Sequence, residues 1–321
     1  MTAIGELTAL RREKKADPVR TRPVREKPKP AERNDNKAAL LFLAPWFAGL
    51  FLITIGPMVA SLYLSFTDYS LLDSPEWIGF GNYVEMFGDQ RLLASLRVTF
   101  IYVFVSVPIQ LAVALGLALF LDRGLRGLAI YRSVFYLPSL LGGSVAIAIL
   151  WRQIFGNEGL INQVLSWFGV EGAGWIADPR FALGTLIVLN VWTFGSPMII
   201  FLAGLRQIPV ALYEAASIDG AGKFRQFRSI TVPLLTPIIF FNLVLQIIYA
   251  FQSFTQAFVV SGGTGGPVDS TLFYTLYLYK EGFANLNMGY ASAMAWLLLV
   301  IVGGLTAANF YLSKYWVFYD D

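Results

Sequence analysis

Six stretches of the chain contain no charged residue and dominate its folding possibilities. A helix needs about 20 apolar residues to cross the hydrocarbon core of a bilayer. Charged residues make up 14% of the chain, against about 25% in ordinary soluble domains. Because a bilayer core tolerates only backbone that satisfies its own hydrogen bonds, we expect an all-α polytopic membrane protein with six transmembrane helices. The charge-free stretches are 38–67, 98–121, 133–151, 181–205, 229–268 and 282–313.

Lys and Arg are concentrated in alternate connecting segments. Residues 1–37 carry eleven Lys and Arg against six Asp and Glu, and the loops 122–132 and 206–228 are also basic. The intervening loops are acidic or neutral. Because Lys and Arg favour the cytoplasmic side in short loops, we expect both termini and the loop 206–228 in the cytoplasm. The segment 1–37 is rich in Pro and lacks an apolar core, which predicts a disordered tail rather than a signal peptide.

The residue types that are missing narrow the chemistry. The chain has no Cys and no His, which argues against thiol nucleophiles, imidazole bases and zinc sites. No Asp, Glu, Lys or Arg lies deep within a predicted membrane span. Ion-coupled carriers usually have such a residue there to bind the coupling ion. The sequence Gly220–Phe224 departs twice from the phosphate-binding P-loop pattern. We therefore expect no catalytic residue, bound cofactor, metal or nucleic-acid partner.

The loop 206–233 contains a patterned segment between the fourth and fifth stretches. It reads EAASIDGAGKFRQFRSITVP from Glu214 to Pro233. Its composition predicts a short helix up to Ile218 and a break at Asp219 and Gly220. A second helical stretch is expected from Lys223, ending near Pro233. The small side chains of Ala215 and Ala216 would allow another protein to approach closely.

This segment resembles, position for position, the EAA loop of binding-protein-dependent ABC importer permeases, with Val232 where Leu is usual. The segments 131–138 and 78–83 are also similar to recurring parts of the carbohydrate-uptake permeases of the maltose and glycerol-3-phosphate type. The resemblance covers residues 38–316 and implies a MetI-like permease fold in a bacterial inner membrane. It implies that these residues couple the chain to an ATPase: Glu214, Ala215, Ala216, Asp219, Gly220 and Pro233.

The same resemblance implies a set of partners. These are a second homologous permease, two ATPase subunits that bind ATP and Mg, and an extracytoplasmic solute-binding protein. Membrane lipid and a sugar substrate complete the set. The six-helix domain would span residues 38–316, and the basic tail 1–37 lies outside the resemblance.

A substrate path should appear as polar groups on one helix face. In the fifth stretch, polar residues at intervals of four, three, four and three fall within about 80° of a helix, with Gln252 at the edge. Amides, a phenol and hydroxyls suit a neutral sugar, although such groups also join transmembrane helices to one another. The predicted path residues in the fifth stretch are Asn242, Gln246, Tyr249, Gln252, Ser253 and Gln256. The fourth stretch adds Asn190 and Thr193.

These observations predict a permease subunit for a carbohydrate, most simply an oligosaccharide, with an acidic sugar left open. One alternative is an ABC permease for glycerol-3-phosphate or a glycerophosphodiester. Another, from a different class, is a self-contained secondary carrier.

Overall fold

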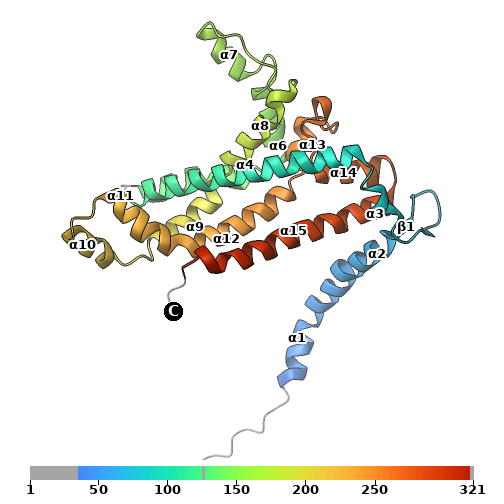
Figure 1. Cartoon of the computed structure of the whole chain (residues 1–321), viewed down its shortest axis with the longest axis horizontal. Helices are drawn as coiled ribbons and strands as arrows, with labels where there is room; N and C mark the ends of the chain where they lie inside the picture. Colours follow the sequence, from blue (N-terminus) through green and yellow to red (C-terminus); the bar gives the residue numbers. More distant parts are fainter. Residues whose placement is uncertain (1–34, 125–126, 319–321) are drawn as a thin grey trace, which may run out of the picture. The chain divides into compact units, whose positions relative to one another are not determined.

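The computed structural model describes residues 35–124 and 127–318 (Figure 1). The expected basic tail 1–37 lies outside the described residues, except for its last three. The chain divides into two compact units, Met1–Pro57 and Met58–Asp321.

The described part of the first unit is helical. Helix α1 (Asp35–Gly49) continues into a π-helical turn, η1 (Leu50–Ile55), and α2 (Gly56–Leu64) starts at the boundary of the unit. The apolar run Ala39–Leu64 has a mean hydropathy of 2.1 and is long enough to cross a membrane. This run corresponds to the first predicted span.

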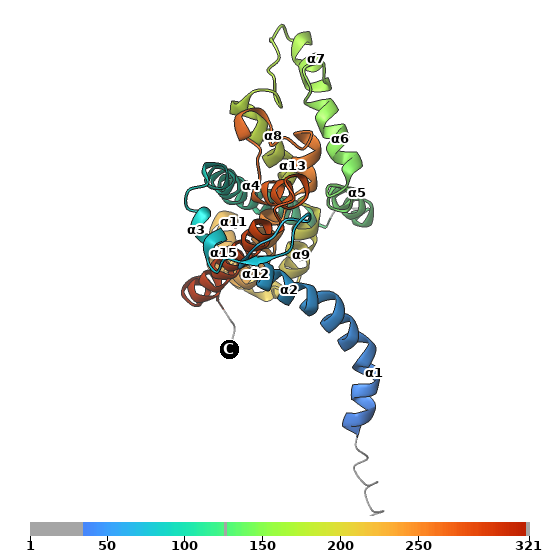
Figure 2. The ribbon, with the colours of Figure 1, turned by 90° about the vertical axis from the view of Figure 1, so that its right-hand side faces the viewer.

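Three long helices form the centre of the second unit: α4 (Gln90–Leu121), α12 (Val232–Phe251) and α15 (Met288–Trp316). Helix α12 packs against both α4 and α15 (Figure 1). In Figure 2 the unit is turned so that β1 and α3 face the viewer. The shorter helices are α3 (Gly81–Glu85), α5 (Leu128–Leu141), α6 (Val145–Ile154), α7 (Leu160–Trp167), α8 (Pro179–Trp192), α9 (Gly195–Leu205), α10 (Val210–Ile218), α11 (Lys223–Gln226), α13 (Thr255–Val260) and α14 (Tyr274–Tyr279). The π-helical and 3₁₀ turns are η2 (Phe227–Thr231), η3 (Pro267–Asp269) and η4 (Lys280–Ala284).

The all-α fold is confirmed, with one small addition. Strands β1 (Thr67–Asp68) and β2 (Glu76–Trp77) pair antiparallel, with Thr67 opposite Trp77. Within the described residues, four continuous helices are long and apolar enough to cross a membrane, and the number rises to six if each of two bent helix pairs is one span.

The two bent pairs correspond to the third and fourth predicted spans. Helices α5 and α6 meet at 95°, and α8 and α9 meet at 41°. Gly142, Gly143 and Ser144 form the first break, where the Ser144 hydroxyl accepts a hydrogen bond from the backbone of Ile147. Two glycines followed by a Ser N-cap end one helix and begin another. The third predicted span, 133–151, therefore consists of two helices with a bend between them.

The fifth span also differs from its expected bounds. A continuous helix runs from Lys223 to Phe251, so the expectation that a short helix ends near Pro233 was wrong. Proline removes a backbone donor, but it is tolerated in the first turn of a helix. Here the π-helical turn η2 precedes it, and the N–H of Val232 reaches back five residues to the carbonyl of Phe227. At the other end, the helix stops at Phe251, and α13 starts in a new direction.

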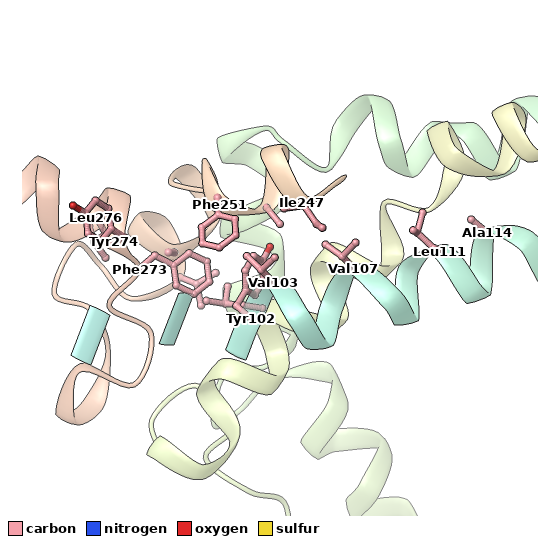
Figure 3. Close-up of a cluster of buried hydrophobic side chains, with 14 of the residues drawn as sticks. Tyr102, Val103, Val107, Leu111, Ala114, Ile247, Phe251, Phe273, Tyr274 and Leu276 are labelled. Carbon is pink, nitrogen blue, oxygen red and sulfur yellow. The ribbon is translucent and has the colours of Figure 1, made fainter. Parts of the chain in front are cut away.

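The core of the second unit lies where α4 meets α12 and α14 (Figure 3). Tyr102, Val103 and Val107 are buried on α4. The rings of Tyr102 and Phe273 lie 4.4 Å apart, and those of Phe100 and Phe251 lie 5.2 Å apart. Such aromatic pairs add to the stabilisation from buried area. The buried positions of α4 recur every three or four residues, as expected for one face of a helix.

One end of the second unit, here called the coupling end, carries α10 and α11 (Figure 1). Arg206 at the start of the loop lies 3.6 Å from Asp122, the residue that follows α4. The backbone N–H of Phe318, beyond α15, donates to the Thr236 hydroxyl at 2.8 Å. The end of α4, the start of the loop 206–228 and a residue just beyond α15 therefore lie at this end, and the strands lie at the opposite end (Figure 1).

Candidate functional site

The loop 206–233, named the coupling loop for its predicted role, contains a short helix with a well-defined end. Helix α10 finishes at Ile218, and the Gly220 N–H donates to the Ser217 carbonyl at 3.1 Å. The Ala221 N–H donates to the Ala216 carbonyl at 2.8 Å. This pattern is a Schellman cap, which needs a left-handed residue after the helix. Gly220 supplies it with a φ of 77°, so the predicted break at Asp219 and Gly220 is confirmed.

The predicted coupling residues divide into two groups. Glu214, Ala215, Asp219 and Gly220 are exposed, and Ala216 is half-buried. Pro233 is not part of this surface, because it lies in the first turn of α12. Three apolar side chains on α10 and α11 are also exposed: Val210 by 68%, Phe224 by 76% and Ile218 by 87%.

A pocket of about 560 Å³ lies among the two bent spans and the end of α12. It brings together seven of the eight predicted path residues, namely Asn190, Thr193, Gln246, Tyr249, Gln252, Ser253 and Gln256. Pockets of about 300–1,000 Å³ are typical of ligand sites. A larger hollow of about 820 Å³ lies among residues of the segment 157–180 and includes none of the predicted residues.

The last three residues reach the pocket for a reason that the helical spacing did not capture. Gln252, Ser253 and Gln256 lie beyond the end of α12, in the turn and in α13. The continuous helical stripe from Asn242 to Gln256 was therefore wrong. The turn at Phe254, with φ −130° and ψ −57°, brings these residues to the pocket instead.

Asn242 is separate from the pocket. Its side chain is completely buried in α12, and neither of its amide atoms has a hydrogen-bond partner among the described residues. Gln246 and Tyr249, one and two turns further along α12, do reach the pocket. The helical spacing therefore predicts that Gln246 and Tyr249 share a face, but it does not predict how deep along α12 the pocket reaches.

Part of the pocket wall is held by hydrogen bonds between the two broken spans. Ser139 donates to the carbonyl of Thr193 at 2.8 Å and accepts from the Ser196 N–H at 2.9 Å. Gln110 donates to the Thr193 carbonyl at 3.1 Å. Gln256 donates to the Gly142 carbonyl at 3.1 Å. A Cβ at position 142 would collide with the Thr193 methyl group, so the breaks in the two spans meet closely.

Other groups in the pocket are free of such bonds. Within the described part of the chain, no hydrogen bond engages the side chains of Gln246, Tyr249 or Gln252. Tyr249 is 61% exposed. These two amides and one phenol can therefore donate to and accept from a ligand.

The contribution of the third span to this site was not predicted from the sequence. Ser139 and Gly143 line the pocket beside Tyr102 of α4. The signal that could have identified them is the run Gly142-Gly143-Ser144, because such a run inside an apolar stretch indicates a helix break. Broken helices often line substrate sites in transporters.

A carboxylate joins three elements at the opposite end. One oxygen of Asp89 accepts from the backbone N–H groups of Arg91 and Leu92 at 2.9 and 3.1 Å. Its other oxygen accepts from the hydroxyls of Tyr277 and Tyr290, each at 2.7 Å. Burial raises the pKa of Asp89, but these four hydrogen bonds outweigh it, so the pKa lies below the ordinary value of 3.8. The start of α4 is thereby fixed to α14 and α15.

Comparison with known proteins identifies the family to which this architecture belongs. The family model described as "Binding-protein-dependent transport system inner membrane component" matches residues 78–313. The chain is 53% identical to the probable ABC transporter permease protein YesP of Bacillus subtilis, over 90% of this chain and 94% of that protein. It is 33% identical to the lactose transport system permease protein LacF of Rhizobium radiobacter, over 85% of this chain and 93% of that one.

A solved structure shares the fold. A chain from the crystal structure of a bacterial ABC transporter involved in the import of the acidic polysaccharide alginate superposes with a TM-score of 0.72 and 20% identity. The superposition covers 87% of this chain and 96% of that chain. The bent spans, the coupling loop and these matches agree: the chain belongs to the family of binding-protein-dependent inner-membrane transport components, the permease subunits of ABC importers, which are not themselves enzymes.

Proposed function

We propose that this chain forms the translocation path for a carbohydrate, an oligosaccharide in particular, and that the pocket between the broken spans contacts it. The observation that carries the proposal is that seven of the predicted path residues, all uncharged and polar, line one pocket. The names of relatives support the substrate class, since LacF is a lactose transport permease.

The chemistry of the pocket favours recognition of hydroxyl groups over recognition of charge. None of the described residues that line it is Asp, Glu, Lys or Arg. A phosphate group would call for Arg or Lys donors, which argues against glycerol-3-phosphate, although UgpA, a glycerol-3-phosphate permease, is 36% identical to this chain. Gln246 and Gln252 supply paired donors and acceptors, and Tyr249 adds an aromatic face.

The coupling loop is the proposed contact with an ATPase subunit that binds ATP and Mg. Glu214, Ala215, Ala216, Asp219 and Gly220 would form the contact, and Pro233 would act only through the start of α12. The exposed apolar side chains of Val210, Ile218 and Phe224 support this assignment, because exposed apolar patches mark interaction sites. A second permease, a second ATPase subunit and an extracytoplasmic solute-binding protein would complete the complex.

The proposed location is the bacterial inner membrane, with both termini in the cytoplasm. The starts of two basic loops and a residue just beyond α15 lie at the coupling end, and basic loops favour the cytoplasmic side. The pocket would then open toward the opposite compartment when the importer receives substrate.

The pocket assignment can be tested by comparing a free amide with a bonded one. In the complete importer, reconstituted with its solute-binding protein, Gln246→Ala should lower maximal transport per assembled complex by about 2- to 12-fold, the value of one lost hydrogen bond. Gln256→Ala should also reduce recovery of assembled complex, because Gln256 holds the Gly142 carbonyl. Leu243→Ala serves as the packing control.

Saturating sugar is needed, because the solute-binding protein dominates the apparent affinity. Neutral and uronic oligosaccharides should be compared in the same assay, and we expect the neutral series to be transported faster. If Gln246→Ala loses complex in proportion to activity, the amide joins helices and the pocket assignment fails. Transport by this chain alone in vesicles would instead establish the rival class, a self-contained secondary carrier.

A further inference from the structure

Two hydrogen bonds join the coupling helix α10 to the base of the fifth span. The hydroxyls of Tyr213 and Thr231 lie 2.9 Å apart. One turn further along α10, the Gln226 amide donates to the Ser217 hydroxyl at 2.8 Å. Here these two bonds are called the first and second rung. They connect positions four apart on α10 with positions five apart on the continuous helix Lys223–Phe251.

The π-helical turn η2 explains why both rungs can form. On a helix with about 100° per residue, residues five apart point about 140° away from each other. With i to i+5 hydrogen bonding the turn is wider, so residues five apart point much closer to the same side than they would on a regular α-helix. The turn η2 fills the interval between Gln226 and Thr231, so both side chains face α10. On α10, Tyr213 and Ser217 share a face because they are four apart.

Additional bonds close the second rung onto the helix cap. Gln226 also donates to the carbonyl of Ala221 at 3.0 Å, just beyond the left-handed Gly220. The Ser217 hydroxyl in turn donates to the Tyr213 carbonyl at 2.7 Å. The loop that joins α10 to α11 is therefore fixed at both of its ends.

The first rung is protected from water, which makes it the stronger of the two. Thr231 is 4% exposed, and Tyr213 packs with Ile230 against the buried cluster of the second unit. A hydrogen bond between groups shielded from water is stronger than one in solvent. The second rung is exposed, so it fixes the orientation of α10 relative to the fifth span more than it adds to stability.

We propose that the rungs make the coupling helix and the fifth span one rigid lever, in which Tyr213, Gln226 and Thr231 are positioning residues. The proposal rests on the proposed coupling of α10 to an ATPase. Movement imposed on α10 would then reach Gln246 and Tyr249 along the same helix that begins at Lys223. Without the rungs, α10 could remain bound to the ATPase and yet move independently of α12.

The test separates docking from transmission. Variants Tyr213→Phe, Thr231→Val and Gln226→Met each remove one rung and keep the side-chain shape, and Tyr213→Phe with Gln226→Met removes both. Arg225→Met is the matched control, because Arg225 is exposed and has no part in either rung. The measurements are recovery of the ATPase with the complex, and sugar transported per ATP hydrolysed in proteoliposomes.

We expect the double variant to retain the ATPase while sugar transported per ATP falls about fivefold or more, as for two ordinary hydrogen bonds. Thr231→Ser, which keeps the hydroxyl, should give the ratio of the unaltered chain, whereas Thr231→Val should lower it. An unchanged ratio in the double variant overturns the proposal, as does loss of the ATPase in proportion to transport. Normal docking and transport in Gly220→Pro would instead overturn the proposed coupling itself.

Discussion

Gly220→Ala tests whether the cap of the coupling helix is needed for docking. Gly220 has a φ of 77°, and nothing lies within 4 Å of a Cβ built on it. The substitution therefore introduces no collision. Its effect comes only from forcing an L side chain into left-handed backbone.

The size of the effect follows from that backbone term. A left-handed conformation costs an L residue about 1–2 kcal/mol, which corresponds to about a 5- to 30-fold change in an equilibrium constant. If α10 must end in this cap to dock, the apparent dissociation constant for the ATPase rises in proportion to the fall in the population of the capped conformer. We therefore expect the ATPase to bind up to about 30-fold more weakly.

Gly222→Ala is the matched control, two residues away. Gly222 has φ −66° and ψ 162°, which any L residue adopts, and the space around its Cβ is also open. Titration of the purified permease complex with the ATPase subunit should show a shift for position 220 and none for 222. Unchanged affinity in both variants would refute the idea that the cap geometry controls docking. An equal loss of affinity in both would point to a requirement for glycine flexibility instead.

Three further outcomes are expected. Single cysteines at Asn157 and Thr264, introduced on a Cys-free chain, should react with an impermeant thiol reagent from outside spheroplasts; protection of both until lysis would reverse the topology. Asn242→Leu should leave the unfolding temperature in detergent unchanged or raised, because it removes a buried amide without a partner among the described residues; a clear fall would reveal such a partner. Asp89→Asn should lower stability at pH 7 by about 1.5–3 kcal/mol. A carboxyl whose pKa is lowered by folding stabilises the fold fully at a pH above its pKa in the unfolded chain, near 3.8. That stabilisation is lost as the pH falls through the pKa of the folded chain, so only the unaltered chain should lose stability from this source below about pH 3.8. Parallel profiles of stability against pH for the two chains would contradict this.

The sequence predicted the elements that arise from composition and local turn chemistry. The charge-free stretches located the apolar helices, because the cost of placing charge in hydrocarbon acts on every residue of a span. Gly220 marked the end of α10, because a left-handed cap is a local requirement. The presence of Gln246 and Tyr249 on one face followed from the helical period alone.

Tertiary structure determined what the sequence pattern could not. The pattern continued from Asn242 to Gln256 as if on one helix, but the chain turns after Phe251, and the last three residues reach the pocket from a different direction. The π-helical turn before Pro233 is another case, because an extra residue in a turn leaves no mark in composition. The contribution of Ser139 depends on the packing of α5 against α9, which brings its hydroxyl to the break in the fourth span.

The Asp89 cluster has a consequence for how the protein is made. Its hydroxyl donors lie 188 and 201 residues further along the chain. A ribosome delivers α4 long before it delivers α15, so the start of α4 remains without these partners until the last helix has been inserted. Because closing such a long loop costs entropy that only the finished contact repays, truncated or stalled chains would keep an unclosed extremity. The cluster would thus distinguish a chain that has inserted α14 and α15 from one that has not.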